Sequence, residues 1–123
     1  MSIENTTRTK ILTQRDREFV KRALGYFGIG AVKIDWSDSK EKYPDIWVNP
    51  SSTPVITVTH EWEKQKPAER RKRIVHEMLH VKGLQHNDKI GYSTYPDKDS
   101  FSMKVYDDIM GGSRKFERRR FLK

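Results

Sequence analysis

Residues 67–86 read P-A-E-R-R-K-R-I-V-H-E-M-L-H-V-K-G-L-Q-H, and this stretch predicts both a long helix and a chemical site. Pro67 suits the first turn of a helix, and Glu69 favours the positive end of the helix dipole. The apolar residues recur as on the buried side of a helix: Ile74, Val75, Met78, Leu79 and Val81. The stretch therefore predicts a helix over residues 67–82 that packs against a sheet.

Two histidines share one face of this helix. His76 and His80 are four residues apart, so they lie one turn above each other. Glu77 is turned about 100° round the helix, near enough to hold a metal-bound water. Gly83 can adopt a left-handed backbone conformation cheaply, which ends the helix and lets His86 return to the same metal. Three neutral imidazoles and one open position describe a catalytic zinc site, because a structural zinc site is closed by a fourth protein ligand.

The unbroken pattern H-E-x-x-H-x-x-G-x-x-H from His76 to His86 resembles the signature of the metzincin metallopeptidases. The resemblance implies a zinc endopeptidase with His76, His80 and His86 as metal ligands. It also implies that Glu77 takes a proton from the attacking water and delivers it to the leaving amine. The competing interpretation, a solvated surface helix, does not explain why three of the four histidines fall within residues 76–86.

The resemblance further implies a Met-turn, a tight turn whose methionine forms an apolar floor under the metal. Residues 108–112, D-I-M-G-G, fit that turn because two glycines can make the bend. Met110 is therefore the expected floor, in preference to Met103, which has no turn-forming neighbour. Some metzincins carry a tyrosine two residues after the methionine, where this chain has Gly112. That tyrosine is absent here or is supplied from elsewhere, by Tyr92, Tyr95 or Tyr106.

The rest of the chain predicts an α+β fold, with a small mixed sheet packed on an N-terminal helix and on the helix of the motif. Thr13 followed by Asp16 resembles a capping box, and helical spacing of apolar residues predicts a helix over residues 13–27. Residues 32–36 alternate as a half-buried strand, residues 45–48 form a short strand, and residues 55–59 are five β-branched residues in a row.

The remaining segments are weaker in pattern. Residues 61–66 are a charged connection without an apolar repeat, and residues 87–102 are expected to form a loop around the site. Residues 113–123 are expected to form a final helix. In metzincins an exposed edge strand binds the substrate in extended form by adding it to the sheet. Either residues 45–48 or residues 55–59 can be that strand, and the sequence does not decide between them.

Length and composition indicate a single domain over residues 1–123. The hydrophobic and charged fractions are both 34%, so the core is lean and a bound metal can contribute to stability. The absence of cysteine excludes disulfides and thiolate metal sites. Residues 1–10 lack the apolar core of a secretion signal, and no apolar run is long enough to span a membrane. A cytoplasmic protein is expected.

The charge is concentrated in the half of the chain that carries the motif. Residues 1–63 hold nine basic and nine acidic residues, whereas residues 64–123 hold sixteen basic and eight acidic ones, which accounts for the net charge of +8. Most of the excess lies in residues 70–73 and residues 114–120. Such a basic surface attracts nucleic acid or an acidic polypeptide, although a solvated basic face that aids solubility is an equally simple explanation.

These observations favour a zinc-dependent endopeptidase that acts on protein or peptide substrates. A second hypothesis is a nucleic-acid-associated metalloprotease that acts on DNA-bound proteins, because the second half is basic. A third is a latent or non-catalytic metal-binding protein, in which residues 1–10 or the basic tail cover the metal. The intact Glu77 argues against a protein that has lost its turnover. Substrate specificity and oligomeric state are not encoded in any pattern of this sequence.

Overall fold

The computed structural model describes residues 2–5, 11–41, 44–84 and 100–121, which form a mixed α+β fold. The elements in chain order are β1 (Ser2–Asn5), α1 (Gln14–Phe27), β2 (Ala31–Trp36), β3 (Ile46–Asn49), β4 (Val55–Val58), α2 (His60–Glu63), α3 (Pro67–Val81), α4 (Ser100–Met110) and a 3₁₀-helix (Arg118–Phe121). The predicted α+β class, with an N-terminal helix and the helix of the motif on a mixed sheet, is confirmed.

The four strands form one sheet in the order β1-β2-β4-β3. β1 and β4 both pair with β2 in parallel, and β3 pairs with β4 in antiparallel orientation. β3 is therefore an edge strand, while β4 lies between two neighbours. This settles which segment can be an exposed edge: residues 45–48 can, and residues 55–59 cannot.

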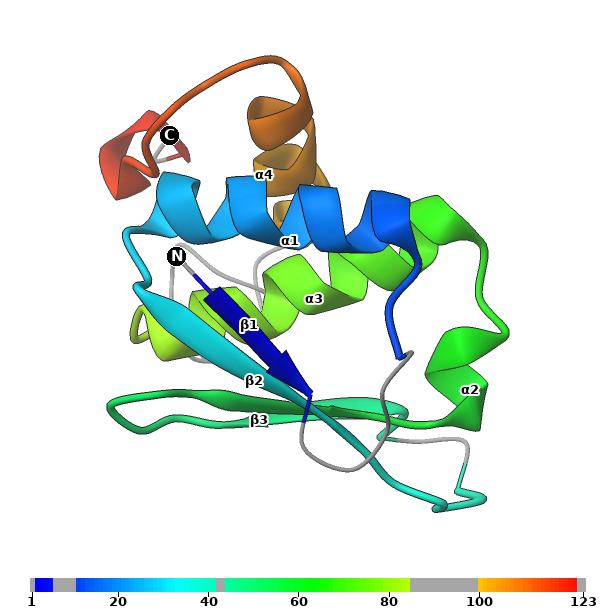
Figure 1. Cartoon of the computed structure of the whole chain (residues 1–123). Coiled ribbons are helices and arrows are strands. Elements are labelled where there is room, and N and C mark those ends of the chain that lie inside the picture. The colour runs from blue at the N-terminus through cyan, green and yellow to red at the C-terminus, as the bar shows by residue number, and fades with distance from the viewer. Residues whose placement is uncertain (1, 6–10, 42–43, 85–99, 122–123) are drawn as a thin grey trace.

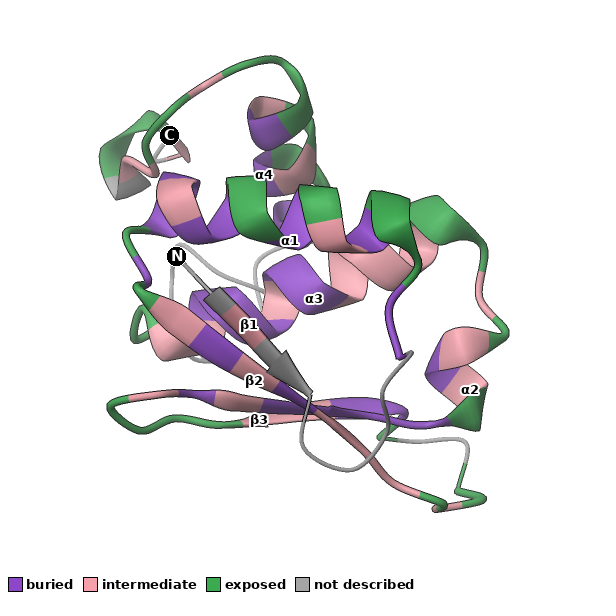
Figure 2. Ribbon diagram, viewed as in Figure 1, coloured by how far each residue is buried: buried purple, intermediate pink, exposed green. Residues whose placement is uncertain are grey.

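Helices α1 and α3 cover one face of the sheet (Figure 1). Along β2, buried residues alternate with half-buried ones, as Figure 2 shows. Val32, Ile34, Ile56 and Val58 form the buried layer of the sheet, each at most 1% exposed. Ile74, Val75, Met78 and Leu79 of α3 pack into the same core, which confirms the buried side predicted for this helix.

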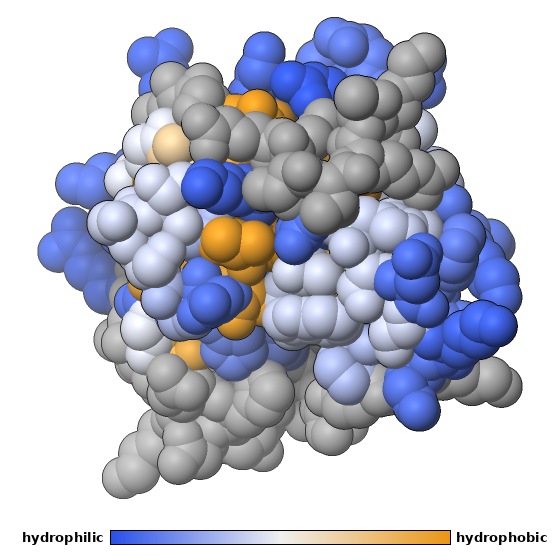
Figure 3. Space-filling model, turned by 60° about the horizontal axis from the view of Figure 1, so that its bottom comes forward, coloured by the Kyte–Doolittle hydropathy of each residue, from blue (hydrophilic) through white to orange (hydrophobic). Residues whose placement is uncertain are grey.

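The side of the molecule that bears β3 comes forward in Figure 3, where apolar side chains form a narrow strip and small patches between hydrophilic ones. In the part of the chain described, no helix is long and apolar enough to cross a membrane.

The N-terminal helix begins and ends as its sequence predicts. The Thr13 hydroxyl accepts a hydrogen bond from the Asp16 backbone N–H at 3.1 Å, which caps the helix. Gly28 adopts a left-handed conformation with φ of 70°, which ends it. The carboxylate of Asp16 is buried and forms ion pairs with Arg70 and Arg71 of α3 at 3.2 and 3.0 Å. These ion pairs fix the start of α1 against the start of α3.

Two further elements, β1 and α2, differ from the sequence predictions. β1 forms from the polar N-terminus because its backbone can pair with β2, with Ile3 packed on the core. α2 forms in the segment expected to be an irregular connection, and it buries Trp62 completely. The Trp62 Nε1–H donates to the Arg70 carbonyl at 3.1 Å, so this short helix is anchored on α3.

The segment after residue 99 also differs. Residues 100–102 belong to α4 and not to a loop, because Phe101, Val105 and Ile109 recur every fourth residue and are fully buried. Residues 85–99, which make up most of the expected loop, lie outside the described residues. The predicted C-terminal helix is present as α4, which lies earlier in the chain than residues 113–123; within that range the described residues form the 3₁₀-helix Arg118–Phe121.

The chain after α4 is held by Asp108 and by aromatic packing. Asp108 accepts hydrogen bonds from Tyr26, Ser113 and Arg120 at 2.7, 2.7 and 2.8 Å. Burial raises the pKa of the Tyr26 hydroxyl, and its hydrogen bond to Asp108 raises it further. The ring of Phe116 packs on Tyr26 and on the neighbouring Phe27. The tail, the described residues 111–121 after α4, therefore packs on the C-terminal end of α1.

Candidate metal centre

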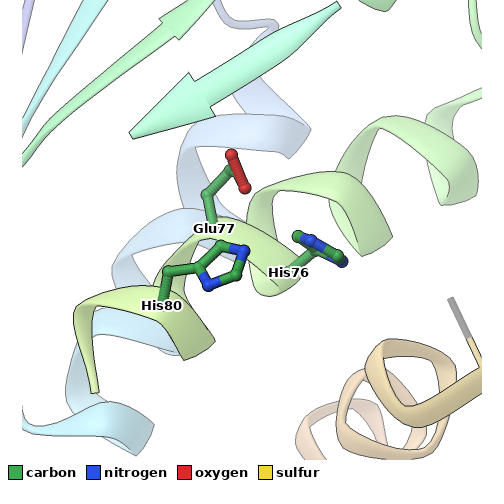
Figure 4. A group of neighbouring side chains, drawn as sticks. All are labelled: His76, Glu77 and His80. Carbon is green, nitrogen blue, oxygen red and sulfur yellow. The ribbon is translucent and has the colours of Figure 1, made fainter. Parts of the chain in front are cut away.

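His76, Glu77 and His80 come together on α3 as a group that can hold a metal ion. One ligand atom from each of the three residues lies within 4.8 Å of the others. The two imidazole rings have centroids 4.9 Å apart and planes 75° apart, because residues one helical turn apart face the same side. Figure 4 shows both rings on one side of α3 and the Glu77 carboxylate turned toward the sheet.

The three side chains differ in exposure. Both histidines are half-buried, so their rings are accessible from solvent, whereas Glu77 is only 6% exposed. Burial of a carboxylate beside two imidazoles is costly unless polar or charged groups face it. The arrangement is therefore suited to a cation that enters from the solvent side and meets Glu77 at its inner side.

The orientation of His80 is fixed by the backbone that follows the helix. Its Nδ1 lies 2.8 Å from the Leu84 carbonyl oxygen. A carbonyl can only accept a hydrogen bond, so Nδ1 carries the proton and a neutral His80 presents its lone pair at Nε2. Metal-binding histidines commonly have this arrangement, in which a carbonyl holds one ring nitrogen and the metal takes the other.

Gly83 places that carbonyl. It has φ of 93°, in the left-handed region, as its position at the end of the helix predicts. The Leu84 N–H donates to the Leu79 carbonyl at 3.0 Å and the Gly83 N–H donates to the His80 carbonyl at 2.9 Å. This pair of hydrogen bonds is a Schellman motif, which turns the chain back over the last turn of α3. The buried Leu84 side chain holds the turn in place.

A prediction follows for Gly83. Gly83→Ala is expected to lower the free energy of unfolding by about 1–2 kcal/mol, because a left-handed conformation is strained for alanine. It is also expected to weaken metal binding, because the carbonyl that orients His80 shifts with the turn. Denaturant unfolding and a zinc titration measure the two effects. Gly30→Ala is the matched control, since Gly30 has no positive φ and an added methyl there meets nothing within 4 Å. Equal effects of the two substitutions would contradict this role of Gly83.

His76 is contacted from α4. Its Nδ1 lies 3.4 Å from the hydroxyl oxygen of Ser102, which is fully buried. The start of α4 therefore lies against the metal centre, as Figure 4 shows at its lower right. The sequence pattern did not predict this contact, because Ser102 was expected to lie in a loop.

The third predicted ligand, His86, lies outside the described residues, as do Tyr92 and Tyr95. The described chain reaches Leu84, two residues before His86, at the point where the Schellman motif has turned it back. His86 as a ligand stays a prediction. Tyr106, the third tyrosine considered, packs its ring on Phe19 of α1 at a centroid distance of 5.3 Å.

Met110 as a floor under the metal stays a prediction. Met110 is the last residue of α4, is 48% exposed, and lines a surface groove together with residues of α1. It is eight residues beyond Ser102 on the same helix, about 12 Å along the axis. The bend expected after it does occur, with Gly112 at φ of 101°. Met103 is also exposed, at 41%, because the buried side of α4 is taken by Phe101, Val105 and Ile109.

The edge strand β3 lies beside the centre. α3 contacts β3, and in Figure 4 the strand nearest Glu77 has the colour of residues 46–49. Arg73 of α3 donates to the buried Asp45 carboxylate at 3.0 Å, and the Thr59 hydroxyl donates to the Asp45 carbonyl at 2.8 Å. These two hydrogen bonds fix the start of β3 next to the helix that carries the histidines.

The basic cluster at residues 70–73 proves to be largely structural. Arg70 and Arg71 pair with Asp16, Lys72 pairs with Glu69, and Arg73 pairs with Asp45. Four cations that looked like a surface for anionic partners are thus used within the fold. In the second cluster, Arg120 pairs with Asp108 and Arg119 with Glu117, while Arg114 and Lys115 are exposed.

The described parts of both terminal segments have other places in the fold. Residues 2–5 form β1, and the tail packs on α1 and, through Phe121, on Phe101. The latency hypothesis, in which one of these segments covers the metal, gains no support from them.

Comparison with known proteins leaves the family open. No family model matches the chain, and no curated protein or solved structure matches it significantly. The similarity to metzincins therefore rests on the sequence of residues 76–86 and on the site geometry described above.

Proposed function

We propose that this protein is a zinc-dependent endopeptidase of metzincin type. The observation that carries the proposal is the convergence of two imidazoles and a buried carboxylate within 4.8 Å on one helix. The Leu84 carbonyl supports it, because it directs the Nε2 lone pair of His80 to the side available for a cation. Nitrogen ligands of this kind suit zinc, and the sequence supplies His86 as a third.

Zinc, when bound, acts as a Lewis acid toward a carbonyl and makes a water acidic enough to attack it. Glu77 is the group on this chain that accepts the proton of the attacking water. Its burial keeps it beside the imidazoles and away from bulk solvent, which strengthens its interaction with charge that develops there. Glu77 then delivers the proton to the leaving amine, and His76 and His80 hold the metal in place throughout.

β3 is the proposed substrate-binding strand. It is an edge of the sheet, it lies beside Glu77 in Figure 4, and Arg73 and Thr59 hold Asp45, the residue just before it. A peptide that adds to this edge by backbone hydrogen bonds is extended and passes the metal centre in a fixed register. This mode of binding favours unfolded or flexible substrates over folded domains.

The experiment uses the purified chain loaded with zinc and an unfolded protein as substrate. We expect cleavage that a chelator abolishes and added zinc restores. His80→Ala is expected to abolish cleavage and to lower zinc affinity by at least about a hundredfold, because loss of a ligand exceeds the effect of losing its outer partner. His60→Ala is the matched control: His60 lies on α2, is exposed, and is not part of the group.

The outcomes separate the alternatives. Unchanged zinc affinity in His80→Ala would contradict the proposed centre. Zinc binding that depends on His80 without any cleavage would favour the non-catalytic metal-binding protein. Cleavage that rises when DNA is added and falls steeply with salt would favour the nucleic-acid-associated protease.

A further inference from the structure

A second feature of the surface lies where α1 meets the N-terminal part of α3 and the end of α4. A surface groove of about 300 Å³ runs between α1, the N-terminal part of α3 and the end of α4. Its lining residues are Arg15, Glu18, Phe19, Arg22, Arg71 and Met110. None of these residues belongs to the metal centre, so the groove needs its own explanation.

The groove is basic. Three arginines line it against one acidic side chain, Glu18, which accepts a hydrogen bond from Gln14 at 3.3 Å. Arg15 and Arg22 are exposed and seven residues apart, so they lie on the same face of α1 two turns apart. Neither forms an ion pair with any residue that the structure describes. Arg71 is held by Asp16 at 3.0 Å and forms a fixed wall.

The groove also has an apolar part. Met110 is 48% exposed there, and the buried Phe19 ring lies beneath, packed on Tyr106. Met103, seven residues earlier on the same face of α4, is 41% exposed. These two methionines are the large exposed hydrophobic residues of the described chain. Methionine side chains are flexible and polarisable, and they adapt to apolar groups of a partner.

We propose that this groove binds an acidic peptide segment that carries an apolar side chain between its acidic residues. Arg15 and Arg22 bind the carboxylates and Met110 contacts the apolar side chain. The two arginines are separated by about 10 Å along the helix axis. In an extended peptide, residues four positions apart lie on the same face about 13 Å apart, and the residue midway between them shares that face. Two acidic residues at that spacing are within reach of the two long arginine side chains.

Two other occupants fit less well. Nucleic acid binds to cations through its phosphates and to exposed aromatic rings through its bases, whereas the aromatic ring here, Phe19, is 5% exposed. A second copy of this chain carries a net charge of +8 and is repelled by the same arginines. An acidic and apolar peptide matches both parts of the groove.

The probe is a fluorescein-labelled peptide with two glutamates four positions apart, a leucine midway between them, and serine or glycine at the other positions. Binding is followed by fluorescence anisotropy with a chelator present, so the result does not depend on the metal centre. We expect Arg15→Glu and Arg22→Glu each to weaken binding about tenfold or more, because a like charge replaces a partner. Met110→Ser is expected to weaken it about tenfold through loss of apolar contact. Glu18→Gln is expected to strengthen it.

Lys40→Glu is the matched control, since Lys40 is exposed in the loop after β2 and the change in net charge is the same. Circular dichroism verifies that each variant is folded; Arg15→Glu places an acid in the first turn of α1, where the helix dipole favours it.

The proposal is overturned if Lys40→Glu weakens binding as much as Arg15→Glu, or if a peptide with glutamine in place of glutamate binds equally well. Binding of oligothymidine but not of the peptide, with the same arginine dependence, assigns the surface to nucleic acid. Self-association that Met110→Ser abolishes, without peptide binding, assigns it to a second copy.

Discussion

Glu77→Gln is expected to bind zinc as the wild-type chain does and to lose peptide hydrolysis by about 10²–10⁴-fold. Glutamine keeps the shape of the side chain, but an amide replaces the carboxylate, so it cannot accept the proton of the attacking water. The buried position of Glu77, at 6% exposure, leaves no room for bulk water to take over as the base. Initial cleavage rates of an unfolded protein, with zinc content measured in parallel, provide the test.

The matched control for this substitution is Glu69→Gln. Glu69 lies on the same helix, is half-exposed, and pairs with Lys72. We expect it to change cleavage little, because a surface ion pair contributes at most about 1 kcal/mol to stability and Glu69 is not in the metal-binding group. If Glu77→Gln cleaved as fast as Glu69→Gln, the proposed role of Glu77 as the base would be wrong.

Asp16→Ala is expected to lower the free energy of unfolding by about 3 kcal/mol, because it leaves two arginines without their buried partner. Asp16 is 1% exposed, and the Arg70 and Arg71 side chains are only 13% and 16% exposed. Arg70 is further committed by a hydrogen bond to the Gln65 carbonyl at 2.8 Å, so it cannot turn out to solvent without losing that contact. Urea unfolding in the presence of a chelator measures the effect without stabilisation by metal.

Glu18→Ala serves as the control for Asp16→Ala. Glu18 is an exposed acidic residue on the same helix, and its removal is expected to change stability by about 0.5 kcal/mol or less. Asp16→Asn, which keeps the shape but not the charge, is expected to fall between the two. An Asp16→Ala protein as stable as Glu18→Ala would show that the ion pairs contribute nothing to the association of α1 with α3.

Elements with a clear period were predictable from the sequence. The helical spacing of apolar residues from Phe19 to Phe27 predicted α1, and that from Ile74 to Val81 predicted α3. The strands β2, β3 and β4 follow from alternation and β-branched residues. Two elements without such a signal were missed. β1 has Ile3 as its only apolar residue, and α2 is too short for a period to show.

α4 was missed for a different reason. Residues 87–102 were expected to form a loop because they are polar and show no clear period, whereas the buried residues Phe101, Val105 and Ile109 of α4 recur only from the end of that segment onward. The position of Met110 at the end of α4, where it is 48% exposed, was not predictable from the sequence either. A methionine beside two glycines fits a turn, but only the packing of α4 on α3 decides which side of the helix faces the histidines.

Within the site, the spacing of His76, Glu77 and His80 was sufficient to predict that they come together, because one helix determines their geometry. The contacts that orient the two imidazoles were not predictable in the same way. The Leu84 carbonyl depends on the Schellman turn at Gly83, and Ser102 depends on the tertiary packing of α4. Likewise, the sequence alone predicts a basic surface patch at residues 70–73, because its acidic partners Asp16 and Asp45 come from distant parts of the chain.

The proposed function depends on His76 and His80 binding one metal ion together. X-ray absorption spectroscopy at the zinc edge, on the chain loaded with one equivalent of zinc, measures this directly. We expect imidazole nitrogens at about 2.0–2.1 Å from the zinc, and loss of that signal in the double variant His76→Ala with His80→Ala. A zinc spectrum without imidazole ligands, or the same spectrum in the double variant, would show that the two histidines do not bind the metal.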